Sequence, residues 1–278
     1  HLPGLGIAQA LHGAGCDVSI WGRNPGKARE LASALRGRGD ARHRVPHGDP
    51  RDRREQARPH PHLARDLTGE ARVIAVSEVK GLIEQFSHKI VIESYLLRGL
   101  SDHADLMFRI HAHALSDTQQ FLTSLLGTRL GRHLVATTYL HGVTKPAAYA
   151  PGFPETMKQS LQSPTPDAGA KSYAIVIPIR KDAEWWVLDQ ETRATLMQEH
   201  TQAALPYMNT VKRKLYHSSG LDDFDFITYF ETDKLEDFHS LIRALEQVKE
   251  FRHDRRFGHP TLLGTIRPLD DILELFAR

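Results

Sequence analysis

Histidine is the residue type that first suggests chemistry in this sequence. The chain holds 17 histidines but a single cysteine, Cys16. One cysteine excludes an internal disulfide and any cysteine-based zinc or iron–sulfur cage, so a bound metal needs histidine, carboxylate or a prosthetic ring. Four histidines, at positions 43, 47, 60 and 62, fall in a run rich in Arg, Pro and Asp. That run is too poor in large apolar residues to form a core, which weakens the case for metal binding by the histidines as a group.

His200 is the histidine best placed to face an interior. The sequence predicts a helix from Asp189 to Leu205, with Asp189 as the N-cap. Leu196, His200 and Ala203 recur along it at three- and four-residue spacing, which puts His200 on the inward stripe. Such a histidine is either a hydrogen-bonded core residue or a metal ligand.

Arg213 and a tandem tryptophan flank this helix. In the predicted strand 211–217, Arg213 shares one face with Val211 and Leu215. It is either a buried guanidinium paired with a carboxylate on an edge strand, or a cation aimed into a cavity where it holds an anion. Trp185 and Trp186 precede the helix and either line a flat aromatic ligand or fill the core.

The elements that position these residues follow a repeated order. The first copy has a helix at 79–86, strands at 90–97 and 106–112, a helix at 116–126 and a strand at 134–140, with Val73–Val76 as a candidate opening strand. The second copy has a strand at 173–179, the helix at 189–205, strands at 211–217 and 224–230, a helix at 234–248 and a strand at 261–266. Strand, helix, strand, strand, helix, strand is the ferredoxin-like order, so an α+β fold with two ferredoxin-like halves is expected.

The N-terminal zone follows a different pattern. Gly4-Leu5-Gly6-Ile7-Ala8, Gly13-Ala14-Gly15 and the predicted strand 16–21 resemble part of a short-chain dehydrogenase, an incomplete Rossmann-like fragment without its first strand. The expected divisions are this fragment at 1–36, an Arg/Pro/His-rich linker at 37–72, a first half at 73–150, a connecting loop at 151–171 and a second half at 172–278. An NADPH site in residues 1–36 is one alternative for function.

Longer strings carry a more specific resemblance. The run Tyr173 to Trp186, the run Val211 to Asp223 and the segment Phe226 to Thr232 resemble the chlorite dismutase family, in its long-subunit respiratory branch. The likeness continues through Tyr95-Leu96-Leu97-Arg98-Gly99 and Gly142-Val143-Thr144-Lys145-Pro146, and covers about residues 79–278. It implies a fold of the dimeric α/β barrel type.

The resemblance also implies a set of site residues. His200 matches the axial ligand of haem b iron, and Glu250 matches the carboxylate that binds the other imidazole nitrogen, which makes the ligand a stronger donor. Arg213 matches the catalytic distal arginine. The residues that match those bordering the haem and its propionates are Tyr149, Lys181, Trp185 and Trp186.

The implied reaction converts chlorite to chloride and O2. Iron takes an oxygen atom from chlorite, a ferryl species and hypochlorite form, and the two recombine while Arg213 retains the anion. Alternatives are a coproheme decarboxylase, against which Arg213 argues because that group typically lacks the distal arginine, and a haem-binding protein without chlorite turnover. The family also implies a homopentamer in the periplasm.

Composition excludes other classes. The 278 residues are 25% charged and 40% hydrophobic with a formal net charge of +2, and no apolar run reaches the roughly 20 residues of a membrane span. A soluble chain that does not bind nucleic acid is expected, because the basic run lacks aromatic residues for base stacking. No signal peptide is predicted in this chain, which begins at His1, so a cytoplasmic location stays open.

If no strand forms before the helix at 79–86, the first sheet has an open edge.

Overall fold

The computed structural model describes residues 69–101, 104–145, 155, 158–159 and 171–277, together with the backbone of a strand at residues 15–22. The predictions for residues 1–14, for most of the linker and for most of the loop at 151–171 lie outside the described residues.

Nine strands of the described chain form one antiparallel sheet. They are β1 (Gly15–Gly22), β2 (Ile90–Leu96), β3 (Leu106–Ala112), β4 (Val135–Val143), β5 (Tyr173–Lys181), β6 (Val211–His217), β7 (Phe226–Thr232), β8 (Asp254–Phe257) and β9 (Leu262–Ile266). Their order is β7-β6-β4-β1-β3-β2-β9-β5-β8, and β5 pairs again with β7. The sheet therefore curls until it meets itself, and the fold is α+β.

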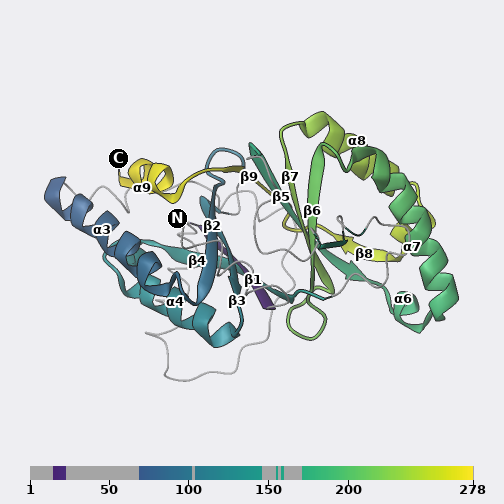
Figure 1. Ribbon diagram of the computed structural model, residues 1–278, viewed down its shortest axis with the longest axis horizontal. Helices are drawn as coiled ribbons and strands as arrows, with labels where there is room; N and C mark the ends of the chain where they lie inside the picture. The colour runs from purple at the N-terminus through teal and green to yellow at the C-terminus, as the bar shows by residue number, and fades with distance from the viewer. Residues whose placement is uncertain are drawn as a thin grey trace, which may run out of the picture.

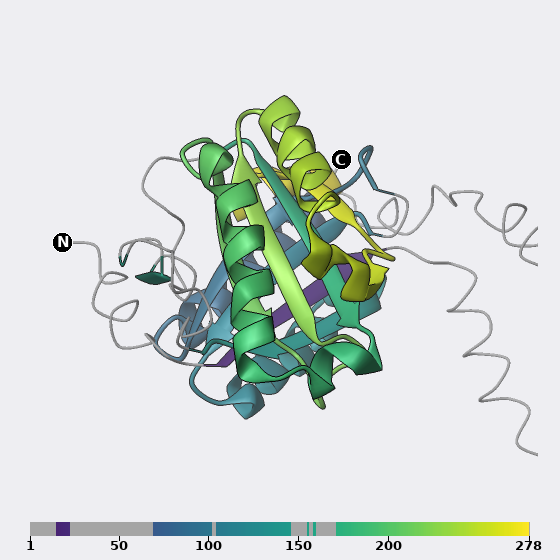
Figure 2. The same ribbon diagram turned by 90° about the vertical axis from the view of Figure 1, so that its right-hand side faces the viewer.

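Helices pack on the outside of the curled sheet at two ends (Figure 1). The helices are α3 (Gly69–Phe86), α4 (Leu115–Gly127), α6 (Ala183–Val187), α7 (Gln190–Ala204), α8 (Leu235–Leu245) and α9 (Leu269–Ala277), with short 3-10 turns η2 (Gly131–His133), η3 (Leu205–Tyr207) and η4 (Lys249–His253). The first group, α3, α4 and α9, covers an apolar core against β2 and β3 that includes Phe108 and Phe121. In the second group, α7 and α8 lie across the strands (Figure 2) over a core that includes Ile177 and Phe230. A third core, with Tyr95 and Tyr229, lies between these two.

The strand β1 differs from the Rossmann-like arrangement expected for the N-terminal part. It pairs antiparallel with β3 on one side and β4 on the other, whereas a Rossmann-like unit would place it in a parallel sheet. An open edge was expected only if no strand formed before the helix at 79–86, and β1 pairs with that edge of β3.

The segment Val73–Val76 is a second correction. It was expected as an opening strand, but it lies inside α3, which begins at Gly69, within the range assigned to the linker. Ala75, Val79 and Phe86 are the buried residues of this helix. Their spacing of four and seven residues is a helical period, so burial of one helical face decided the structure of a run whose β-branched residues favour a strand. No helix among the described residues is both long and apolar enough to cross a membrane.

A buried polar cluster joins the early strands to the late ones. Arg109 on β3 is fully buried, and its guanidinium donates to the Tyr95 hydroxyl (3.1 Å) and the Tyr216 hydroxyl (2.8 Å). It is also paired with Glu93 and lies 3.9 Å from Glu231 on β7. The charge of Arg109 is therefore matched by carboxylates from two parts of the sheet, as a buried charge requires.

Candidate functional site

A cavity of about 430 Å³ opens between α7 and the strands β5, β6 and β7. This volume is within the range of about 300–1,000 Å³ typical of small-molecule and cofactor sites. Apolar side chains, among them Met197, Leu215, Phe226 and Phe230, form much of the wall, and His200 and Arg213 both line it. The site therefore combines a mostly apolar chamber with a few polar groups.

His200 reaches the cavity because of how α7 begins. As predicted, Asp189 caps the helix: its carboxylate accepts hydrogen bonds from the Thr192 backbone N–H (2.8 Å) and hydroxyl (2.7 Å). From that start, Arg193, Met197 and His200 recur at intervals of four and three residues, and all three line the cavity. His200 itself is 8% exposed.

The hydrogen bonds of His200 define its tautomer. Nδ1 lies 2.9 Å from a carboxylate oxygen of Glu250 on η4. An ionised carboxylate only accepts, so Nδ1 carries the proton and Nε2 keeps its lone pair. That lone pair accepts from Nη1 of Arg213 at 3.2 Å. Burial lowers the pKa of His200, and Arg213 lowers it further against the opposing effect of Glu250. The imidazole is therefore neutral near pH 7, which is the form that binds a metal.

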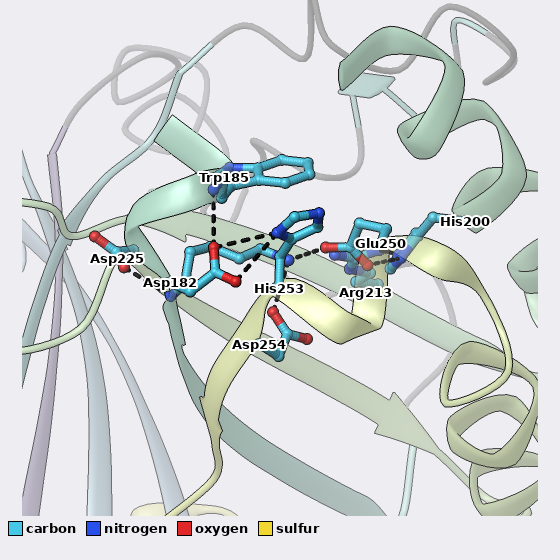
Figure 3. A network of polar contacts seen from close by, with 9 residues as sticks. Asp182, Trp185, His200, Arg213, Asp225, Glu250, His253 and Asp254 are labelled. Carbon is cyan, nitrogen blue, oxygen red and sulfur yellow. Dashed lines mark hydrogen bonds and ion pairs between the residues drawn. The ribbon is translucent and has the colours of Figure 1, made fainter. Parts of the chain in front are cut away.

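Glu250 is ionised although it is buried. Burial raises the pKa of this carboxyl, but the hydrogen bond with His200 and the charge of Lys181 outweigh burial and bring the pKa to about 2. Lys181 forms an ion pair with it. Glu250 therefore supplies a permanent negative charge beside the imidazole (Figure 3), where it binds Nδ1, whereas Arg213 binds Nε2.

Arg213 projects from β6 as the strand alternation predicted. It lines the cavity together with Leu215, and its guanidinium carbon is 6.0 Å from the ring centroid of Phe230. Of the two readings open for Arg213, the structure places the guanidinium in a cavity, against an imidazole nitrogen.

The remaining predicted residues have different surroundings. Trp185 and Trp186 lie on α6 and both line the cavity: Trp185 is 4% exposed, and Trp186 is 45% exposed and stacks on Phe226. Lys181 also lines it, but its ammonium group is held by Glu250 and Asp254 and lies 4.6 Å from the Trp185 ring centroid. Tyr149 lies outside the described residues.

Three residues near the cavity were missed by the sequence analysis. Asp254 pairs with Lys181 at 2.6 Å, and Arg193 donates to the backbone carbonyl of Leu188 at 2.9 Å, which ties α7 to the segment that carries the tryptophans. Burial, together with the charge of Lys145, lowers the pKa of His217 to about 4, so His217 is neutral at pH 7. The spacing of Arg193 seven residues before His200 was a usable signal, whereas nothing in the local sequence marks Asp254 as a partner of Lys181.

The donor set fits a haem. A neutral imidazole presents a lone pair to an apolar chamber, a carboxylate fixes its tautomer from behind, and Arg193 and Lys145 are cations on the wall that suit acidic substituents of the macrocycle. The distance of 3.2 Å between Nη1 of Arg213 and Nε2 of His200 leaves no room for an iron atom and its porphyrin ring. Haem binding therefore requires the Arg213 side chain to move away from the imidazole.

Comparisons with known proteins agree with this chemistry. A family model described as chlorite dismutase matches residues 72–267. The chain is 39% identical over 204 residues to the chlorite dismutase of Ideonella dechloratans, covering 73% of this chain and 72% of that protein. It is 28% identical over 194 residues to a coproheme decarboxylase of Mycolicibacterium smegmatis, covering 67% and 79%.

Among solved structures, chlorite dismutase from Candidatus Nitrospira defluvii in complex with imidazole is 57% identical, with a TM-score of 0.77, and the match covers 99% of each chain. The likeness thus extends beyond the residues 79–278 expected from the sequence strings. From the family match, the identity with the Ideonella protein and the shared structure, it follows that this chain belongs to the chlorite dismutase family.

Proposed function

We propose that this protein converts chlorite to chloride and O2 at a haem bound through His200. The observation that carries the proposal is the arrangement of the imidazole between two charges. Glu250 holds Nδ1 at 2.9 Å, while Arg213 stands 3.2 Å from Nε2 on the cavity side. When bound, haem supplies an iron centre for oxygen-atom transfer from chlorite.

The residues of this chain provide the surroundings for that chemistry. Glu250 accepts the Nδ1–H hydrogen bond and makes His200 electron-rich, which favours a strong bond to a ferric centre. Arg213, once displaced from the imidazole, is a cation in an apolar chamber, where attraction to a small anion is stronger than in water. It would hold chlorite and the anion derived from it inside the chamber when haem is bound, which would contribute to catalysis by proximity.

The finer identity of the cofactor and the assembly are part of the same proposal. We take the cofactor as haem b and the active form as a homopentamer in the periplasm; family resemblance supports all three. We also describe the fold as two ferredoxin-like halves. The support is the element order β5, α7, β6, β7, α8, β9, and the matching order β1, α3, β2, β3, α4, β4. The mass of the assembly by light scattering and its recovery after cell fractionation test the assembly and the location.

One experiment separates this function from its alternatives. Purified protein is loaded with haem b, its absorption spectrum is recorded, and chlorite is added in an oxygen electrode. A Soret spectrum with one O2 released per chlorite supports the proposal. A Soret spectrum without O2 indicates a haem-binding protein, and decarboxylation of coproheme with peroxide, followed by mass spectrometry, indicates the decarboxylase. His200→Ala is the control for specific ligation and should lose the haem.

A further inference from the structure

A second buried carboxylate lies behind Glu250, and the proposed function gives it no role. The side chain of Asp254, the first residue of β8, is 4% exposed, and its Oδ1 lies 2.6 Å from Nζ of Lys181. The side chain of Lys181 is also 4% exposed, and its ammonium group is shared with Glu250. A continuous line of polar contacts therefore runs from His200 through Glu250 and Lys181 to Asp254. Figure 3 labels His200, Glu250 and Asp254 along this line.

The charges along this line do not balance. Two carboxylates face one ammonium group and a neutral imidazole, so the fully ionised set carries a net charge of −1 in a buried site. An unmatched buried charge is costly, and one carboxyl group is expected to take up a proton easily. Glu250 is not that group, because it has two polar partners and a pKa of about 2.

Asp254 is the member that titrates near neutral pH. Burial raises its pKa to about 6 against the opposing effect of Lys181. The charged and titratable groups that act on it are Lys181 from β5 and Glu250 and His253 from η4: Glu250 raises its pKa and His253 lowers it. His253 is itself engaged with Asp182, whose carboxylate lies 3.1 Å from its Nδ1.

We propose that Asp254 is a positioning residue that acts on His200 through Lys181 and Glu250. By binding the ammonium group of Lys181, Asp254 sets how strongly Glu250 accepts the hydrogen bond from His200. The inference rests on haem ligation by His200. When Asp254 is ionised, it shares the ammonium group of Lys181, and Glu250 accepts a stronger hydrogen bond from Nδ1–H of His200. When Asp254 is protonated, Lys181 pairs with Glu250 alone. The imidazole then donates less electron density to the iron.

Ionisation of Asp254 adds a negative charge near the haem and weakens the hold of Lys181 on Glu250. Both changes shift the ferric/ferrous equilibrium of the haem in the same direction. An electron-rich imidazole and a nearby negative charge stabilise ferric over ferrous iron. The ferric/ferrous midpoint potential of the holoprotein is therefore expected to fall as pH rises through the titration of Asp254. Asp254→Asn removes the titrating group and keeps a side chain of similar shape, so it fixes the site in the neutral form.

The test is spectroelectrochemistry of haem-loaded wild type, Asp254→Asn and Glu184→Gln between pH 5 and 8. Glu184 is an exposed carboxylate on the neighbouring helix α6, so its variant controls for a general change of charge. At pH 8 the Asn variant is expected to favour ferrous haem about tenfold more than wild type, equivalent to about 59 mV. The difference should vanish toward pH 5, and Glu184→Gln should follow wild type. Coincident curves for Asp254→Asn and wild type would overturn the proposal.

A measurement on wild type without haem keeps the test independent of folding and of cofactor uptake. Carboxyl ¹³C and imidazole ¹⁵N resonances are followed by NMR during a pH titration. The Asp254 carboxyl is expected to titrate near pH 6, with the His200 nitrogen shifts moving at the same midpoint. If the ¹⁵N chemical shifts of His200 do not change at the pH where Asp254 titrates, the inference is contradicted. Failure of the proposed function has a different signature, which is wild-type protein that takes up no haem or releases no O2 from chlorite.

Discussion

Nη1 of Arg213 lies 3.2 Å from Nε2 of His200, the imidazole nitrogen that faces the cavity. The guanidinium thus donates to the same lone pair that a metal would use. Since the two partners compete for one lone pair, removing Arg213 should leave haem binding intact while it removes the cation that retains the anion.

The first prediction concerns Arg213→Ala. Haem affinity, measured by absorbance titration, is expected to equal or exceed that of wild type, because no side chain has to leave Nε2. Chlorite turnover should fall roughly tenfold or more, since a preorganised cation is lost, and more hypochlorite should escape to a chemical trap. Arg243→Ala, which removes an exposed arginine of α8, is the matched control. Unchanged turnover and unchanged hypochlorite release in Arg213→Ala would refute the role of Arg213.

The second prediction concerns Glu250→Gln. The neutral amide oxygen accepts the Nδ1–H bond more weakly than a carboxylate does, so His200 is held less firmly and loses its electron-rich character. Loss of such a partner typically costs 10–100-fold in metal affinity, and haem dissociation measured by transfer to an acceptor globin should accelerate to that extent. Glu184→Gln removes an exposed carboxylate and should leave dissociation unchanged. Equal dissociation rates for wild type and Glu250→Gln would show that this contact does not support ligation.

Local patterns predicted the elements that carry His200 and Arg213. The strand Val211–His217 has the predicted bounds, and α7 begins at the predicted cap, because alternation and an Asp N-cap are local signals. The strand β1 could not be placed in this way. Its position depends on backbone pairing with β3 and β4, about a hundred residues away.

The contacts of Glu250 with His200 and Lys181 were predictable only through the family resemblance. Glu250 lies 50 residues beyond His200, and Lys181 lies 69 residues before Glu250, so no spacing rule links them. Asp254 was missed for the same reason. It begins β8, a short strand with the sequence Asp-Arg-Arg-Phe whose two arginines are exposed, and it becomes buried only when β8 pairs with the end of β5. Tyr149 stays a prediction.

The third prediction is the acid stability that Glu250 confers. Its pKa is about 2 in the folded protein and 4.5 ordinarily, so its contribution is complete above pH 4.5 and is lost as pH falls toward 2. The shift corresponds to a free energy of unfolding on the order of 3 kcal/mol. Asp254 acts in the opposite direction, since its pKa is raised to about 6 and acidification below pH 6 relieves its cost.

The Glu250 contribution is isolated by comparing variants during urea unfolding between pH 6 and pH 2.5. The stability of Glu250→Gln should fall less steeply than that of wild type below pH 4.5, because the variant has no carboxylate to protonate there. Parallel stability curves for the two proteins would show that Glu250 has an ordinary pKa in the folded state.

The fourth prediction concerns the buried cluster around Arg109. Arg109→Met removes the cation between Glu93 and Glu231 and the donor that binds the hydroxyl of Tyr216, so the two carboxylates inside the curled sheet lose the charge that matches them. Removing one partner of a buried ion pair typically costs about 3–5 kcal/mol, which should appear in the urea midpoint of the unloaded protein. Arg98→Met removes a partly exposed arginine that pairs with Asp105 at 3.1 Å, and such a pair is worth about 1 kcal/mol or less. Equal losses in the two variants would mean that Arg109 does not hold the early and late strands together, and that their association depends on backbone pairing and apolar packing.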